Sequence, residues 1–251
     1  LKDLDDFSTR AAVQVLTRHK PDLTLIHLVN LDLAQHLSGR ESEATRQALL
    51  HMDSLLGQIV DQVDLATTTI VVLGDHGFRD YTKVFHINAL FARSGWLQEE
   101  QGQIFQWKAQ AHPEGGLAAI YVKDRKLIPA VMAALTENAM DRYVVLDRKE
   151  LDRLQAYPEA CCAIEALPGY AFGSNLMGDL VTVLPTTRGN HGQRPLMSEL
   201  HTGFLAVGPG IARGARLPVL NALDVAPTLA KILGLNWVVT EGKPIPIAPA
   251  R

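Results

Sequence analysis

The sequence lacks several features that mark common classes of protein. Its two cysteines, Cys161 and Cys162, are neighbours in the chain, which excludes a framework of structural disulfides and leaves the compartment open between cytoplasm and periplasm. No apolar run approaches the ~20 residues that a membrane span needs. With 24 basic and 27 acidic residues, the chain lacks the excess of positive charge that is typical of proteins that bind a nucleic-acid polymer. With 47% hydrophobic and 20% charged residues, the composition is that of a globular chain.

The start of the chain also lacks two common features. It opens with Leu1 rather than Met, and no charged-then-apolar signal segment follows. We therefore expect either that the true start was removed or that the chain is a fragment of a longer protein. At 251 residues, the chain suits one large domain or one domain with an inserted lobe.

What the chain does contain is an alternation of short apolar runs with longer helical patterns. Residues 41–63 form the clearest helix, because apolar side chains recur there at spacings of three and four. Strands that alternate with helices favour an α/β fold with a mostly parallel sheet flanked by helices. The other expected elements are helices at 9–19 and 221–233 and strands at 23–30, 68–73, 179–184 and 203–207.

Residues 86–178 follow a different pattern. Strand-like runs at 117–122 and 143–146 flank a helical pattern at 127–138. We interpret this stretch as a small inserted α+β lobe, so that residues 1–85 and 179–251 together form a metal-binding α/β core.

Three small groups of polar residues follow predicted strands, where α/β folds place their active sites. Asp32 and His36 come directly after the 23–30 strand, and their spacing of four puts both side chains on one face of a helical turn. A carboxylate oxygen and an imidazole nitrogen suit Zn²⁺ or a similar divalent ion. The alternative is a surface aspartate beside a helix histidine, and this pair alone does not distinguish the two.

The second group is Asp75 and His76, in the run G-D-H-G after the 68–73 strand. A charge and an imidazole beside apolar core are costly without a partner, and a metal ion would supply one. The alternative is a helix-capping aspartate with an exposed histidine. The third group is His191 in G-N-H-G, where the flanking glycines allow close approach to a ligand, although such a histidine also fits a solvated turn.

Three further histidines are weaker candidates. His201 precedes the apolar 203–207 strand, and we expect it to support the site rather than to bind an ion. His86 and His112 lie in the predicted lobe, where a structural polar contact is the alternative to a substrate contact. We predict that His191, and not His201, is the metal ligand.

The order of these groups resembles the alkaline phosphatase superfamily. The chain presents D-x-x-x-H after a strand, an amphipathic helix, G-D-H-G after a second strand, a lobe, and then G-x-H-G with F-L-A-x-G-P-G. This order is most similar to that of type I phosphodiesterases and nucleotide pyrophosphatases. The closing D-V-A-P-T-L-A-K-I-L-G also resembles that family, so the resemblance runs from about Asp22 to Gly242.

The resemblance implies a hydrolase of small phosphate esters, such as nucleotides, that holds two divalent ions, zinc in this family. Asp32, His36 and His191 match the ligands of one ion, and Asp75 with His76 matches half of the other site. The family's remaining aspartate and its Thr or Ser nucleophile have no match. Only 31 residues precede Asp32, and Ser8 and Thr9 follow no strand.

We therefore expect a chain that lacks the nucleophile segment of a larger enzyme and is inactive alone. It would be found with its missing N-terminal segment, or self-associated as a homo-oligomer. The lobe would contribute the leaving-group pocket, and it holds five aromatic residues that a base could stack on, although core packing is their commoner role: Trp96, Trp107, Tyr121, Tyr143 and Tyr170. Two alternatives stay open, namely another hydrolase or mutase of the superfamily, such as a phosphonoacetate hydrolase or a phosphomonoesterase, and a metal-binding remnant without catalysis.

Overall fold

The structure is a computed structural model that describes residues 1–236 and 241–247, and the chain in it divides into two compact units. The first unit comprises residues 1–31, 48–75 and 202–251, and the second comprises residues 32–47 and 76–201. Residues 237–240 and 248–251, which belong to the predicted core, lie outside the described residues. The predicted division into a core and an inserted lobe at 86–178 uses other boundaries and stays a prediction.

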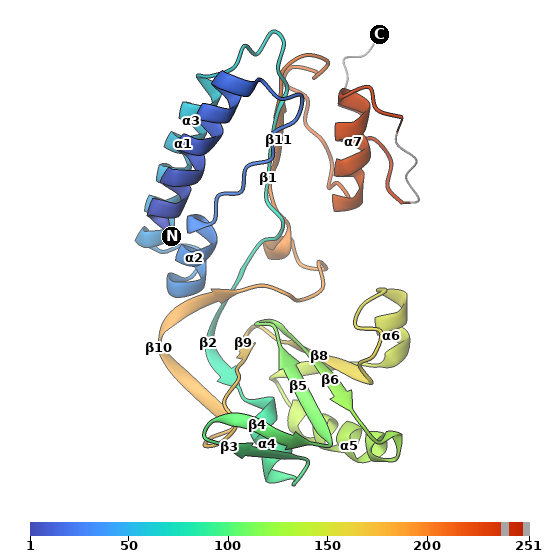
Figure 1. Cartoon of the computed structure of the whole chain (residues 1–251). Helices are drawn as coiled ribbons and strands as arrows, with labels where there is room; N and C mark the ends of the chain where they lie inside the picture. The colour runs from blue at the N-terminus through green and yellow to red at the C-terminus, as the bar shows by residue number, and fades with distance from the viewer. Residues whose placement is uncertain (237–240, 248–251) are drawn as a thin grey trace. The chain divides into compact units, whose positions relative to one another are not determined.

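Two long helices, α1 (Lys2–His19) and α3 (Glu43–Val60), lie side by side in Figure 1. Asp6 of α1 and His51 of α3 approach to 2.9 Å between Oδ1 and Nε2. Leu55 and Ile59 of α3 are buried, as the spacing of apolar residues in the sequence requires. The predicted helix at 41–63 is therefore confirmed, and the one predicted at 9–19 begins earlier, at Lys2.

The rest of the first unit contains a pair of strands and a short helix. Strands β1 (Ile70–Leu73) and β11 (Phe204–Val207) pair antiparallel, with Ile70 opposite Val207. A 3₁₀ turn, η3 (Ala222–Asp224), leads into α7 (Val225–Ile232), close to the helix predicted at 221–233.

The second unit is built from three small sheets. Strand β2 (Arg79–Phe85) pairs antiparallel with β10 (Val181–Asn190) and parallel with β9 (Gly169–Phe172). The order of the four-stranded antiparallel sheet is β5-β6-β8-β7, with bounds Ala109–Pro113, Leu117–Val122, Cys162–Ala166 and Tyr143–Leu146. The remaining elements are the hairpin of β3 (Leu97–Glu100) with β4 (Gln103–Trp107), the helices α4 (Ile87–Arg93), α5 (Ile128–Ala139) and α6 (Arg148–Arg153), and the 3₁₀ turns η1 (Arg125–Leu127) and η2 (Ser198–Leu200). Helix α2 (Asn30–Ser38) belongs to this unit from Asp32 onward.

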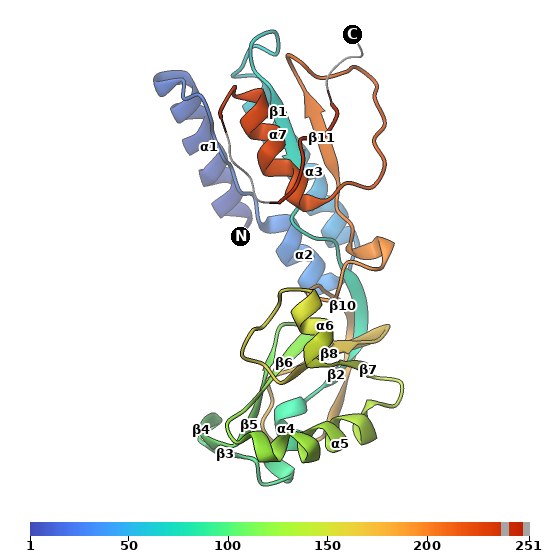
Figure 2. The same ribbon diagram turned by 90° about the vertical axis from the view of Figure 1, so that its right-hand side faces the viewer.

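Strand β6 is buried on both faces and holds this unit together. Its residues Ala118 and Ile120 pack into the same cluster as Val131 and Leu135 of α5. The alternate residues, Leu117 and Ala119, pack with Leu151 of α6. Figure 2 shows α5 and α6 on opposite sides of the sheet, which is why β6 reads as a continuous apolar run.

The fold is mixed α/β, as the sequence predicts, but two finer expectations fail. A mostly parallel sheet is not found, because β2 and β9 are the one parallel pair among the described strands. The strand predicted at 23–30 is wrong: the segment pairs with no strand in the described part of the chain, and α2 begins at Asn30. Among the aromatic residues, Tyr143 and Tyr170 are buried in the core.

No helix in the described part of the chain combines the length and the apolar composition needed to cross a membrane.

Candidate metal centre

Helix α2 carries the first two candidate ligands, Asp32 and His36. Asp32 lies in the first turn, where the helix dipole favours a carboxylate, and His36 lies in the last. The spacing of four brings Nε2 of His36 to 3.6 Å from Oδ2 of Asp32. The sequence prediction that both side chains share one face of a helical turn is therefore confirmed.

The start of α2 is held by a buried carboxylate from α1. Asp5 is 1% exposed, and its two oxygens accept hydrogen bonds from the backbone N–H groups of Val29 (2.8 Å) and Asn30 (2.9 Å). The first N–H groups of a helix have no partner inside the helix, so an acceptor supplied from elsewhere in the chain stabilises its first turn. Asp5 thus positions the turn that carries Asp32.

The imidazole of His36 is oriented by the backbone of β10. Its Nδ1 lies 3.0 Å from the carbonyl oxygen of Gly189. A carbonyl only accepts, so Nδ1 carries the proton and Nε2 keeps its lone pair. Gly189 allows this approach, because a Cβ there would lie 2.6 Å from the carbonyl oxygen of Gln35. A metal-binding histidine is commonly held by its second nitrogen in this way.

His76 lies on the segment between β1 and β2, which the backbone of η2 holds in place. The next two N–H groups, of Gly77 and Phe78, donate to the carbonyl oxygens of Leu200 (2.9 Å) and Glu199 (3.0 Å). A Cβ at Gly77 would collide with the Glu199 carbonyl, so the glycine after His76 is required for this close packing of two backbones.

Phe78 is a residue of the site that sequence reasoning missed. It is 3% exposed, and its ring centroid lies 4.9 Å from that of His36, 5.4 Å from His76 and 5.2 Å from His191, edge-on in each case. One buried ring therefore packs against all three imidazoles. An apolar residue just after G-D-H-G has no ligand chemistry, and its one signal is its place directly before β2.

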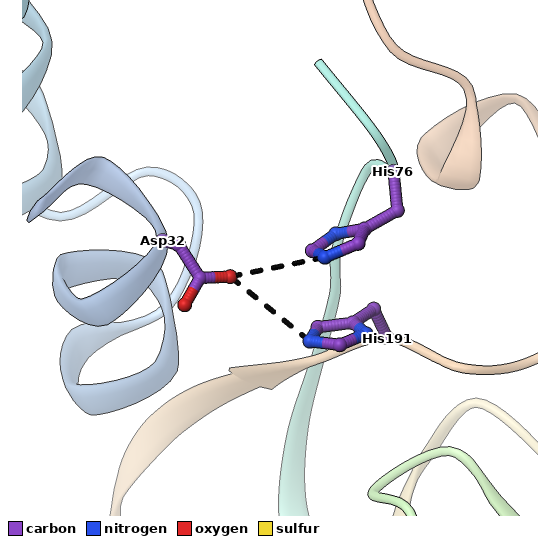
Figure 3. Close-up of side chains that lie close together, drawn as sticks. All are labelled: Asp32, His76 and His191. Carbon is purple, nitrogen blue, oxygen red and sulfur yellow. Dashed lines mark ion pairs between the residues drawn. The ribbon is translucent and has the colours of Figure 1, made fainter. Parts of the chain in front are cut away.

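The structure brings Asp32, His76 and His191 together (Figure 3). Oδ1 of Asp32 lies 3.9 Å from Nε2 of His76 and 4.0 Å from Nε2 of His191. The two imidazole rings stack, with centroids 3.6 Å apart and planes 16° apart. Each of the three residues offers one ligand atom, and these atoms lie within 4.8 Å of one another.

This arrangement fits a divalent metal ion. Ligand atoms on a tetrahedral Zn²⁺, with bonds of about 2.0–2.2 Å, stand roughly 3.3–3.5 Å apart. Closing distances of 3.9 and 4.0 Å to that value needs only small side-chain rotations. Two imidazole nitrogens and a carboxylate oxygen are also the donor set that zinc accepts. His36 lies beside the other oxygen of Asp32 and is not one of the three residues of this group.

The other candidates are not among these three residues. Asp75 is an exposed residue of the first unit, two positions after the end of β1. His201 is exposed, with Nε2 3.3 Å from the carbonyl oxygen of Pro195. His86 is 4% exposed and its Nε2 lies 2.9 Å from the Thr182 hydroxyl, which is a structural contact. Burial lowers the pKa of His86 below its usual value of 6.5. His112, 64% exposed, lies 3.6 Å from Glu114.

A pocket of about 350 Å³ opens beside the imidazoles. It is lined by His36, Glu114, Gly115, His191 and Gly192, all of the second unit. Two of the candidate ligands and the loop between β5 and β6 thus line the same pocket. It provides space for a small molecule beside the candidate metal ligands.

A family model described as type I phosphodiesterase / nucleotide pyrophosphatase matches residues 2–193, which include the whole group of candidate ligands. The chain belongs to this family. The family resemblance predicted from the ordered motifs is therefore confirmed.

The chain is also similar to individual proteins, in sequence to one and in fold to solved structures of others. The bis(5'-adenosyl)-triphosphatase enpp4 of Mus musculus is 22% identical over 212 residues, which are 82% of this chain and 42% of the relative. Murine ectonucleotide pyrophosphatase / phosphodiesterase 5, solved as an inactive variant in complex with AMP, has a TM-score of 0.74 at 20% identity, covering 95% of this chain and 61% of its own. Phosphonoacetate hydrolase from Sinorhizobium meliloti has a TM-score of 0.57 at 20% identity, covering 86% of this chain and 54% of its own. The chain thus spans about half of the length of these relatives.

Proposed function

We propose that this chain forms the metal-binding part of a phosphodiesterase that hydrolyses small phosphate esters, nucleotides among them. The observation that carries the proposal is the convergence of Asp32, His76 and His191, with His36 beside them, in a chain of the type I phosphodiesterase family. The names of the relatives support a nucleotide substrate, since one is a bis(5'-adenosyl)-triphosphatase and another was solved with AMP.

The proposal assigns two zinc ions. Asp32, His36 and His191 would hold the first, and His76 with Asp75 would hold part of the second. The geometry supports a shared role for Asp32, because Oδ2 faces His36 and Oδ1 faces both other histidines. The bound ions would stabilise the charge that develops on the phosphoryl group.

The residues of this chain would prepare the site for that chemistry. The Gly189 carbonyl holds the proton of His36 at Nδ1 and leaves Nε2 for ligation. Phe78 packs against the three imidazole rings and excludes water from that side. Thr9 is a poor candidate for the attacking hydroxyl, since it is fully buried in α1. We therefore propose that the nucleophile comes from a segment outside these 251 residues.

Zinc titration by isothermal calorimetry tests the ligand assignment. We expect His36→Ala and His191→Ala to weaken the tighter binding event by about tenfold or more, because each removes one of three ligands. His76→Ala should affect only the weaker event, and His201→Ala, an exposed histidine of the same unit, should bind zinc like the wild type. Unchanged affinity and stoichiometry in His191→Ala would refute the assignment.

The same zinc-loaded samples show whether the chain acts alone. We expect it to hydrolyse a chromogenic phosphodiester no faster than free zinc does, and to be self-associated or bound to a further segment. The exposure of Leu25 (79%) and Leu205 (68%) in the first unit supports such an association. Metal-dependent turnover by the 251-residue chain, abolished in Asp75→Ala, would show instead that a Ser or Thr of this chain is the nucleophile.

A further inference from the structure

Strand β8 carries a single charged side chain, that of Glu165, among apolar residues. The residue is 5% exposed, and its neighbours Ile164 and Ala166 belong to the core cluster of the second unit. The strand lies between β6 and β7, where Glu165 is opposite Leu117 on one side and Val144 on the other. A carboxylate in such surroundings is costly unless polar groups compensate its charge.

Arg194 compensates this charge with both its backbone and its side chain. Its backbone N–H donates to Oε1 of Glu165 at 2.6 Å. Its guanidinium donates to both carboxylate oxygens, from Nε at 3.2 Å and 3.1 Å and from Nη2 to Oε2 at 2.7 Å. Nη1 donates in addition to Oε1 of Glu150, on α6, at 2.9 Å. Because a forked pair fixes direction as well as charge, the backbone at Arg194 is held in one place against β8.

This contact holds the segment that carries His191, which lies three residues before Arg194. On the other side of His191, β10 stays paired with β2 up to Asn190. The carbonyl oxygen of His191 itself accepts from the N–H of Gly116 at 2.8 Å. Glu165 therefore supplies the attachment on the side where the strand pairing has ended.

Stability alone is a weak reason for a buried ion pair at this place. The cost of removing both charges from water offsets much of their attraction, and apolar residues of similar volume often stabilise a fold as well. Groups behind a metal-binding histidine, in contrast, commonly set its orientation and the affinity for the ion. The pair would thus have its main effect on the place of His191.

We propose that Glu165 is a positioning residue of the metal centre, which holds His191 in its ligand position through Arg194. The inference rests on the proposed function, because it concerns a ligand of the proposed zinc site. Glu165 would act through the backbone of the His191 segment and not as a ligand itself.

Calorimetric titration with zinc in a double-mutant cycle tests this positioning. Glu165→Gln keeps the size of the side chain and one acceptor oxygen but removes the charge. We expect it to weaken the tighter zinc-binding event by about tenfold, as for other groups behind a metal ligand. In the His191→Ala background it should cause no further loss, because the ligand that it positions is gone. Arg194→Lys keeps the charge but loses the fork, so it should show the same pattern with a smaller loss.

Two variants of the same unit serve as controls. Glu159→Gln removes an equal charge from an exposed position, and Val131→Ala lowers stability by opening a cavity in the core. Both should bind zinc like the wild type. Equal weakening in Val131→Ala would show that lost stability explains the effect, and it would overturn the positioning role.

Circular dichroism shows whether each variant is folded, and if Glu165→Gln is not, Arg194→Lys decides. Unchanged zinc affinity in the folded variants, or the same loss with and without His191, would overturn the role of Glu165 and leave the metal centre standing. If His191→Ala itself binds zinc as the wild type does, the proposed zinc site is wrong, and this inference fails with it.

Discussion

Asp5 offers the sharpest test of how the fold supports the candidate site. Its buried carboxylate accepts from the N–H groups of Val29 and Asn30, at the start of the helix that carries Asp32. Asp5→Ala removes both acceptors and leaves two donors in a place where Asp5 is 1% exposed. We expect the variant to lose both stability and metal affinity.

The magnitude follows from the two hydrogen bonds. A buried donor left without an acceptor costs about 1–3 kcal/mol, and losing a helix cap costs about 0.5–2 kcal/mol. Because the two costs describe the same groups, Asp5→Ala should lower the free energy of unfolding by about 2–4 kcal/mol. Asp5→Asn keeps one acceptor oxygen, and we expect about half of that loss.

Urea unfolding followed by circular dichroism measures the change. Asp3→Ala is the control, since Asp3 lies in the same first turn of α1 but is exposed. It loses only a favourable interaction with the helix dipole, about 0.3–1 kcal/mol. A second readout is zinc affinity, which should fall in Asp5→Ala and stay unchanged in Asp3→Ala. If Asp5→Ala unfolds within about 0.5 kcal/mol of the control, the capping argument is wrong.

Two further predictions concern single residues of the fold. Gly77→Ala should lower the free energy of unfolding by more than about 2 kcal/mol, because its Cβ would collide with a backbone carbonyl, whereas Gly57→Ala, on α3 with open space around it, should raise it by about 0.5–1 kcal/mol. Equal effects in urea unfolding would refute the steric argument. For His86, burial lowers the pKa in the folded chain, so the unfolded chain takes up the proton first and stability falls as the pH drops below about 6.5. His86→Gln should flatten this dependence, and an identical pH slope in both proteins would contradict it.

The family and its motifs could be predicted from the sequence because they are short and local. On a helix, residues four apart lie on the same face, and the structure places both Asp32 and His36 on α2. The apolar period of 41–63 likewise predicts α3, since helix geometry depends on neighbours in the chain. The segment 23–30 could not be predicted in the same way. Its apolar run fits a strand, but a strand needs a partner strand to accept its hydrogen bonds. The N–H groups of Val29 and Asn30 donate to Asp5 instead.

By itself, the sequence determined the residue types, their order and the local helices that present them. Only the tertiary structure decided which side chains meet. His76 and His191 are far apart in the chain, and they face the same oxygen of Asp32 because the η2 backbone holds the segment after His76 and the β5–β6 loop contacts the His191 carbonyl. Strand direction and the approach of Glu114 to the pocket depend on the same long-range contacts. Such contacts join residues that are far apart in the sequence. They therefore produce no periodic pattern from which a single sequence could predict them.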